Sequence, residues 1–312
     1  MATALETRLR ESMAEFYETY NRMRQDSIFA RLTLDLPAPA GFFKRTAITL
    51  PGEPTEFKGN ATVHSIDSAA AAVVETLVYE YTLGIDRNLL EKTDELSRGA
   101  VSRIIQGMVG KAIGHMDKKL TALLLTGESA GNLAGGAFFS ATVTIPGGAT
   151  MDNLVGTAVS GSAAEVRSAL HAARHAFISA RNAGNDLVTG AMPTIAVMYD
   201  PRAVNGVLIG QSVMDAIRPD RLDGGYKFDE GSVLPLPNGY LSGSVDDLWF
   251  FDVNAMDKAF VAGWQQRPVL ESNVGVRTDS DRLLNRRDLF QTSWSYECSF
   301  GSPYSAVLGN DA

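Results

Sequence analysis

The sequence contains a single cysteine, Cys298, so the chain cannot form an intramolecular disulfide. Such sparing use of cysteine is typical of proteins from a reducing compartment. No apolar run is long enough to cross a bilayer. Residues 1–10 lack the basic region and apolar core of a signal peptide. We therefore expect a protein that is made in the cytosol and has no membrane segment.

Positive charge is also in short supply, since the formal net charge is −8 and the pI is about 5.1. A protein whose main task is to grip nucleic acid needs a basic footprint, so this composition argues against that class. Hydrophobic residues make up 45% and charged residues 21% of the 312-residue chain. These shares allow a sizeable core and argue against wholesale disorder.

Catalytic motifs are scarce as well. The segment Gly127-Glu128-Ser129-Ala130-Gly131 matches the G-x-S-x-G pattern of the nucleophile elbow in α/β-hydrolases. That elbow needs a strand before the serine, and the triad needs a histidine after its acid. Here a helical pattern precedes Ser129, and the last histidine is His175. An esterase-like serine hydrolase using Ser129 is kept as the alternative of a different functional class.

Candidate metal and thiol sites are equally weak. His171 and His175 lie four residues apart on a predicted helix, but no glutamate of an H-E-x-x-H motif and no obvious third ligand accompany them. Cys298 has no partner thiol and is expected to be a small, half-buried side chain. There is no Walker A sequence and no G-x-G-x-x-G after a strand. We predict no catalytic residue, no cofactor and no metal.

The longest regular pattern runs from Asp94 to Glu128, where apolar residues recur at i, i+3, i+4 and i+7. This spacing predicts an amphipathic helix about 50 Å long, with Asp94 as N-cap and Gly127 as its C-terminal stop. We call it the spine helix. Its water-facing side is predicted to comprise Arg98, Arg103, Gln106, Asp117 and Lys118.

Three glycines lie along one flank of the spine helix: Gly107, Gly110 and Gly114. Each should cost about 1 kcal/mol relative to alanine in a helix interior. We therefore expect a neighbouring helix or sheet to approach closely there.

The segment 36–66 predicts an extended hairpin, with strands at 46–50 and 56–63 around a turn at 51–54. It has few side chains that could form a core, and an isolated hairpin is marginal in water. It should therefore lie on another surface, either the chain's own domain or a neighbouring copy. Lys44, Arg45 and Lys58 could make polar contacts there.

The rest of the chain reads as an α+β arrangement. The helix predicted at 4–25 is either an ordinary surface helix or an arm that grips another subunit. Further predictions are a strand at 72–86, a helix opened by the capping box Ser162–Glu165 and ending near Gly184, an exposed loop at 211–231, and a charged linker at 279–288. The remaining predicted strands are 193–199, 231–236, 247–252, 258–263, 268–277 and 291–300.

Three groups of residues resemble the major head subunits of tailed phages, specifically the Mu-like prophage major head family. They are 56–66 with 80–87 and 90–91; 123–127 with Phe138-Phe139; and 248–252 with 266–268 and 288–290.

The resemblance implies the tailed-phage major capsid fold. Its parts would be an N-terminal arm (1–35), an extended β-hairpin loop (36–66), a peripheral domain with the spine helix (67–190), an axial domain (191–263) and returning strands (264–312). It also implies a virion shell of hexamers and pentamers, assembled in the host cytoplasm, that encloses double-stranded DNA without sequence-specific binding. Scaffold, portal and decoration proteins would be partners.

The predicted inter-subunit contacts are Phe42, Lys44, Arg45, Glu53, Glu56, Phe57, Lys58 and Arg87. An encapsulin-like compartment shell, which would share the fold but enclose an enzyme, is the closer alternative.

Overall fold

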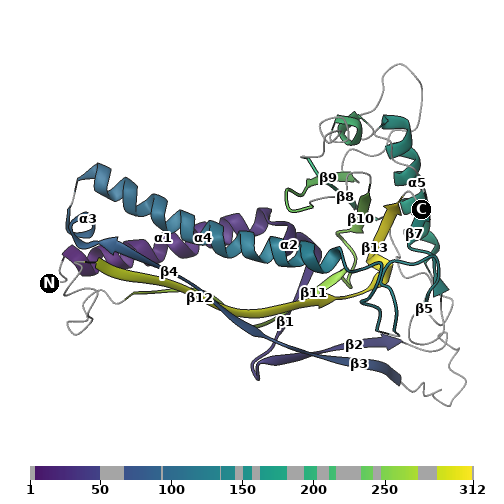
Figure 1. Ribbon diagram of the computed structural model, residues 1–312, viewed down its shortest axis with the longest axis horizontal. Helices are drawn as coiled ribbons and strands as arrows, with labels where there is room; N and C mark the ends of the chain where they lie inside the picture. The colour runs from purple at the N-terminus through teal and green to yellow at the C-terminus, as the bar shows by residue number, and fades with distance from the viewer. Residues whose placement is uncertain are drawn as a thin grey trace, which may run out of the picture.

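The computed structural model describes residues 4–49, 67–92, 94–133, 135–144, 150–156, 162–180, 193–201, 211–215, 233–241, 247–272 and 287–310. The molecule is elongated: two long helices lie along a long twisted sheet, and a smaller sheet stands at one end (Figure 1). Helices and strands are mixed along the chain, as the α+β prediction required.

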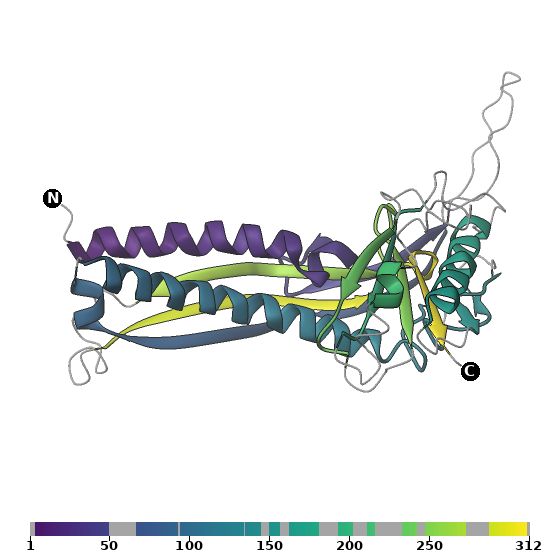
Figure 2. The same ribbon diagram turned by 90° about the horizontal axis from the view of Figure 1, so that it is seen from above.

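The long sheet has four strands in the order β1-β11-β12-β4, with β1 parallel to β11 and the other neighbours antiparallel. The helices α1 and α4 run side by side over one of its faces (Figure 2). Their bounds are α1 (Ala4–Asp26), α4 (Glu95–Leu124), β1 (Thr33–Pro37), β4 (Leu77–Asp86), β11 (Phe260–Ser272) and β12 (Arg287–Phe300). Two short helices connect these layers, α2 (Ile28–Leu32) between α1 and β1, and α3 (Arg87–Glu91) between β4 and α4.

The spine helix is confirmed as α4. Asp94 is its N-cap and accepts a hydrogen bond from the Ser97 backbone N–H at 2.8 Å. The helix ends at Leu124, a few residues before the predicted end, because the Gly127 N–H turns back to the Leu124 carbonyl at 3.0 Å. This tighter i→i−3 bond closes the last turn.

The flanking glycines play different roles. A Cβ on Gly114 would lie 2.9 Å from the Tyr240 hydroxyl oxygen, so a neighbour does approach closely there, but it is a side chain from the turn after residues 233–237 and not a helix or a sheet. A Cβ on Gly110 would make an ordinary 3.8 Å contact with Met23 of α1. At Gly107 no described atom lies within 4 Å of that position, so the prediction is wrong at Gly107.

Asp117 also departs from the prediction, because it does not face water. Its carboxylate is half-buried and accepts a hydrogen bond from the Phe29 backbone N–H in α2 at 2.9 Å. Burial raises its pKa to about 6, and the Phe29 bond opposes that rise. The position turns inward because α2 packs on α4 at this point.

The N-terminal helix packs within its own chain. Phe16 and Tyr20 of α1 are buried in the core shared with α4 and the long sheet, whereas Tyr17 is 42% exposed. The position of α1 agrees with the first of the two predicted alternatives, an ordinary surface helix. The second alternative, an arm that contacts another subunit, stays a prediction.

The strand predicted at 72–86 is divided at Thr76. Its first part belongs to β3 (Asp67–Glu75), which pairs with β2 (Phe42–Thr49), and its second part is β4 in the long sheet. The predicted hairpin strand 56–63 and turn 51–54 lie outside the described residues.

The smaller sheet has five strands in the order β7-β13-β10-β8-β9. Their bounds are β7 (Leu154–Gly156), β8 (Ile195–Tyr199), β9 (Val233–Pro237), β10 (Leu248–Asp252) and β13 (Ala306–Asn310). Every residue of β8 and β10 is buried. Along β10, Trp249 and Phe251 join the core of the long helices, while Leu248 and Phe250 join a second core under α5 (Ala163–Ser179). Burial on both faces explains why these strands read as continuous apolar runs.

The capping box is confirmed at the start of α5, where Ser162 and Glu165 bond each other's backbone N–H groups. Three other predictions are corrected. Residues 211–215 are helical and Val213 is buried, where an exposed loop was predicted. Within the described residues, the predicted strands 258–263 and 268–277 belong to one strand, β11, which ends at Ser272 and whose register shifts at two irregularities. Asp288 lies inside β12 and not in a linker, because β12 pairs with β4 along its whole first half.

The remaining elements are short: β5 (Val143–Thr144) pairs with β6 (Thr150–Met151), and a 3-10 turn spans Pro303–Ser305. Among the helices that the structure describes, none combines the length and the apolar character needed to cross a membrane.

Candidate assembly surfaces

One aromatic side chain packs the base of the β2–β3 hairpin against the long sheet. Phe43 of β2 is buried, with 4% of its surface exposed, and its ring lies over Gly263 of β11. A Cβ on Gly263 would lie 2.0 Å from Phe43 Cδ1, so only glycine leaves room for the ring. The hairpin base therefore rests on the face of the long sheet away from the helices.

Backbone bonds hold the same crossing point. The Ala38 N–H donates to the Trp264 carbonyl at 2.8 Å, and the Thr76 N–H donates to the Gly41 carbonyl at 2.8 Å. Gly41 has a φ of 78°, in the left-handed region that favours glycine. Thr76 is thus the residue at which the chain leaves the hairpin for β4.

The outward side of the hairpin combines apolar and charged side chains. Phe42 pairs with Glu75 and Lys44 pairs with Val73 across the strands. Phe42 is 44% and Val73 60% exposed, and both charged residues are exposed. We call these four residues the hairpin face. Exposed apolar side chains gathered on one face favour a contact surface.

The exposed apolar pattern continues into the next strand. Leu77 is 51% and Val78 74% exposed at the start of β4. Sequence reasoning missed these positions together with Val73, because it treated 72–86 as one strand. The signal available in the sequence was the β-branched and apolar run on both sides of Thr76.

The predicted inter-subunit residues do not form one cluster. Phe42 and Lys44 lie together on the hairpin face, and Arg45 follows them in β2. Arg87 begins α3, at the opposite end of the ten-residue strand β4, about 30 Å from the hairpin base. The other four, Glu53, Glu56, Phe57 and Lys58, lie outside the described residues.

A half-buried polar cluster fixes the spine helix to the long sheet. The Lys119 ammonium lies 2.5 Å from the Glu297 carboxylate and also donates to the Tyr79 hydroxyl. Burial acts to lower the pKa of Lys119, but the bonds to Glu297 and Tyr79 outweigh it and raise that pKa. Burial, helped by the charge of Lys119, lowers the pKa of neighbouring His115. The cluster fixes where α4 crosses β4 and β12.

Ser129 does not have the geometry of a nucleophile elbow. It follows a helix, and its hydroxyl donates to the Thr126 carbonyl at 3.0 Å. Both glycines of the motif are explained by packing: a Cβ on Gly127 would lie 2.7 Å from the Phe139 ring, and one on Gly131 2.3 Å from the Phe300 ring. The motif is the turn that ends the spine helix.

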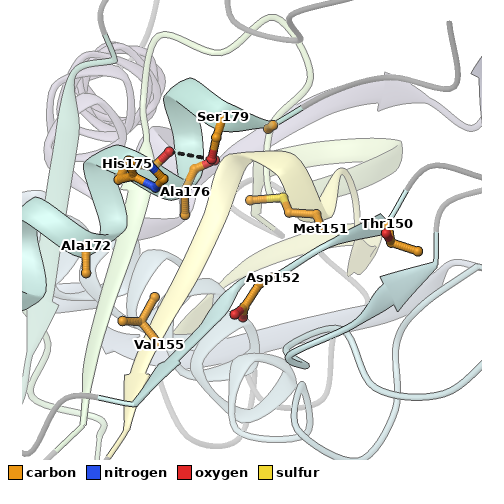
Figure 3. A pocket seen from close by; sticks show the side chains of 9 residues that line it. Thr150, Met151, Asp152, Val155, Ala172, His175, Ala176 and Ser179 are labelled. Carbon is orange, nitrogen blue, oxygen red and sulfur yellow. Dashed lines mark hydrogen bonds between the residues drawn. The ribbon is translucent and has the colours of Figure 1, made fainter. Parts of the chain in front are cut away.

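The histidines of α5 do not converge on a metal site. His175 lines a cavity of about 440 Å³ between α5 and residues 150–155, with small side chains such as Ala172 and Ala176 beside it (Figure 3). Asp152 lies on the opposite wall and accepts a hydrogen bond from the Leu154 N–H at 3.1 Å. His171 does not line this cavity. Within the described residues, no group of three or more His, Cys, Asp or Glu could hold a metal ion.

The chain resembles several solved structures, although no protein-family model and no curated protein matches its sequence. A chain of the bacteriophage JBD30 procapsid matches all of this chain and 77% of its own length, with 13% identity and a TM-score of 0.51. The virus-like particle from Pyrococcus furiosus matches 96% of this chain and 98% of its own, with 10% identity and a TM-score of 0.53. The capsid chain of cyanophage P-SCSP1u matches 92% of this chain and 88% of its own length, with 14% identity and a TM-score of 0.56. The predicted major capsid fold is therefore confirmed.

Proposed function

We propose that the chain is the major capsid protein of a tailed bacteriophage or prophage, which assembles into hexamers and pentamers of an icosahedral shell around double-stranded DNA. Two observations support this function. The capsid fold extends over the whole chain. The hairpin face carries Phe42 and Val73 on a strand pair whose base is fixed to the domain by Phe43 over Gly263.

Finer assignments belong to the same proposal. The Mu-like prophage head family is the proposed relationship, and the arm, hairpin loop, peripheral and axial domains are the proposed parts. Assembly would take place in the host cytoplasm, with scaffold and portal proteins as partners and the virion as the final location. The hairpin face would lie on a neighbouring subunit, because burying Phe42 and Val73 there removes apolar surface from water.

A double variant tests this function. Phe42→Asp/Val73→Asp places two like charges on the hairpin face, whereas Met256→Asp changes an apolar side chain that is 93% exposed elsewhere. Electron microscopy and light scattering should show closed shells for the unmodified chain and for Met256→Asp. The double variant should stay unassembled with an unchanged circular dichroism spectrum. Normal shells from the double variant would contradict the role of the hairpin face, and an unmodified chain that never assembles, even with a scaffold partner, would contradict the function.

An encapsulin-like compartment shell is the second candidate. The match to 98% of the Pyrococcus furiosus virus-like particle chain supports keeping it. The two candidates differ in cargo, so nuclease-protected DNA inside purified particles supports a phage head, and particles filled with protein and no DNA support the compartment.

A further inference from the structure

We call the cavity between α5 and residues 150–155 the α5 cavity, and none of its described lining residues belongs to the hairpin face. Its volume of about 440 Å³ lies within the range of about 300–1,000 Å³ in which proteins hold small ligands. Figure 3 shows α5 on one wall and the segment with Asp152 and Val155 on the other. The size of the α5 cavity suits a small molecule or one long side chain of another molecule.

Hydrocarbon forms the larger part of the lining. Ala172, Ala176 and the C-cap residue Ala180 follow one another at intervals of four residues, so their methyl groups lie on one side of α5. On the facing wall, Met151 is buried in the core under α5 and Val155 packs against that core. The alanines leave the space open, and these five side chains give it an apolar surface.

Polar side chains complete the described lining, namely Thr150, Asp152, His175 and Ser179. The Ser179 hydroxyl is already used, because it donates to the His175 carbonyl of its own helix at 2.6 Å (Figure 3). The Asp152 carboxylate accepts the Leu154 N–H through one oxygen at 3.1 Å. No ion pair within the described part of the chain involves Asp152. A negative charge without a cationic partner among the described residues therefore borders the α5 cavity.

The lining disfavours two classes of ligand. Its described residues include no lysine or arginine, so an anion would meet the Asp152 carboxylate without a compensating cation. Asp152 and His175 are the only described lining residues that commonly bind metals, and a metal site needs more ligands than this pair offers. A ligand that combines a hydrocarbon body with a positive charge matches the lining better than either class.

We propose that the α5 cavity binds an alkylammonium group, with its methylenes against Ala172, Ala176 and Val155 and its charge beside Asp152. Burial of the methylenes and a charged hydrogen bond to the carboxylate both favour this placement. A free primary amine and a lysine side chain of another chain share this chemistry. The inference does not depend on the proposed function, because every described lining residue belongs to one subunit.

Probes with the same hydrocarbon tail and different head groups test the site on the full-length chain. Saturation-transfer NMR should show that hexylamine binds more tightly than hexanol, and hexanol more tightly than hexanoate, because only the amine pairs with Asp152. Asp152→Asn keeps an oxygen for the Leu154 N–H and removes the charge, so it should weaken hexylamine binding by about tenfold and leave hexanol binding unchanged. Asp257→Asn removes the charge of another exposed aspartate and should change neither.

A second variant tests the position of the hydrocarbon tail. Ala172→Leu fills part of the α5 cavity, so it should reduce the binding of hexylamine and hexanol alike, with circular dichroism as the check on folding. Unchanged binding in a folded Ala172→Leu variant would place the tail elsewhere and overturn the proposal. Equal losses in Asp152→Asn and Asp257→Asn would also overturn it, because the amine would then respond only to the net charge of −8.

Assembled shells distinguish the two sources of the ammonium group. A carbodiimide joins a carboxylate to an amine in contact with it, and mass spectrometry locates the product. A cross-link from Asp152 to a lysine of another copy, present in shells and absent from free subunits, would support the site with a neighbouring chain as the source. Hexylamine binding retained in shells without that cross-link would support it with a free amine as the source. The probe titrations need no shells, so a failure to assemble counts against the proposed function alone.

Discussion

The ring of Phe43 occupies the space that any side chain on Gly263 would need, with Phe43 Cδ1 2.0 Å from the position of a Cβ. This contact seats the β2–β3 hairpin on β11. Together with the Thr76–Gly41 backbone bond, it sets the direction in which the hairpin leaves the domain.

Gly263→Ala should therefore lower the free energy of unfolding by about 1–3 kcal/mol, because the added methyl overpacks the site. Gly156→Ala is the matched control, since it also adds a methyl in a strand but meets no described atom within 4 Å. In urea denaturation, Phe43→Ala/Gly263→Ala should lose less stability than the sum of the two single variants. Additive losses would contradict a direct contact between the two residues.

Gly107→Ala should stabilise the fold by about 0.5–1 kcal/mol, because alanine is the better helix former and the position is open. Gly114→Ala should gain less or lose stability, since its Cβ would lie 2.9 Å from the Tyr240 hydroxyl oxygen. Thermal unfolding of the two variants side by side measures the difference. A larger gain at Gly114 than at Gly107 would contradict the packing described here.

Asp117 should make stability depend on pH. Its pKa is about 6 in the folded protein and near 3.8 without burial, so the folded chain holds the proton more tightly. The free energy of unfolding should then fall as the pH rises from about 4 to about 6, and stay lower above that, by about 3 kcal/mol at most. Asp117→Asn keeps an oxygen for the Phe29 N–H, so it should be more stable than the unmodified chain at pH values near 8 and similar near 4. Chemical denaturation at both pH values measures the free energy of unfolding of the two proteins. An identical pH dependence in both would exclude Asp117 as the source of the pH effect.

Cys298 should resist alkylation in the native protein. It is buried, and burial raises the pKa of its thiol to about 12, which leaves almost no reactive thiolate. Iodoacetamide at mildly alkaline pH should label Cys298 only after denaturant is added, as followed by mass spectrometry. Rapid labelling without denaturant would mean that β12 opens readily in the native state.

Local patterns in the sequence determined several elements. The helical period and the Asp94 cap specified α4, the capping box specified the start of α5, and continuous apolar runs specified β8 and β10. Each of these signals depends on neighbouring residues or on simple burial, which a linear pattern records. The capsid fold itself was reached through resemblance and confirmed by the structural matches.

Only the tertiary structure decided where strands divide and which residues meet. Thr76 separates two sheets because its neighbours pair with β2 on one side and β12 on the other. Asp117 turns inward because α2 crosses α4, and Phe43 is buried because Gly263, far along the chain, leaves room for it. The sequence by itself therefore determined the long helices α1, α4 and α5, the apolar strands and the scarcity of catalytic groups. Strand partners and the faces of each element depend on contacts between distant segments, which no local pattern encodes.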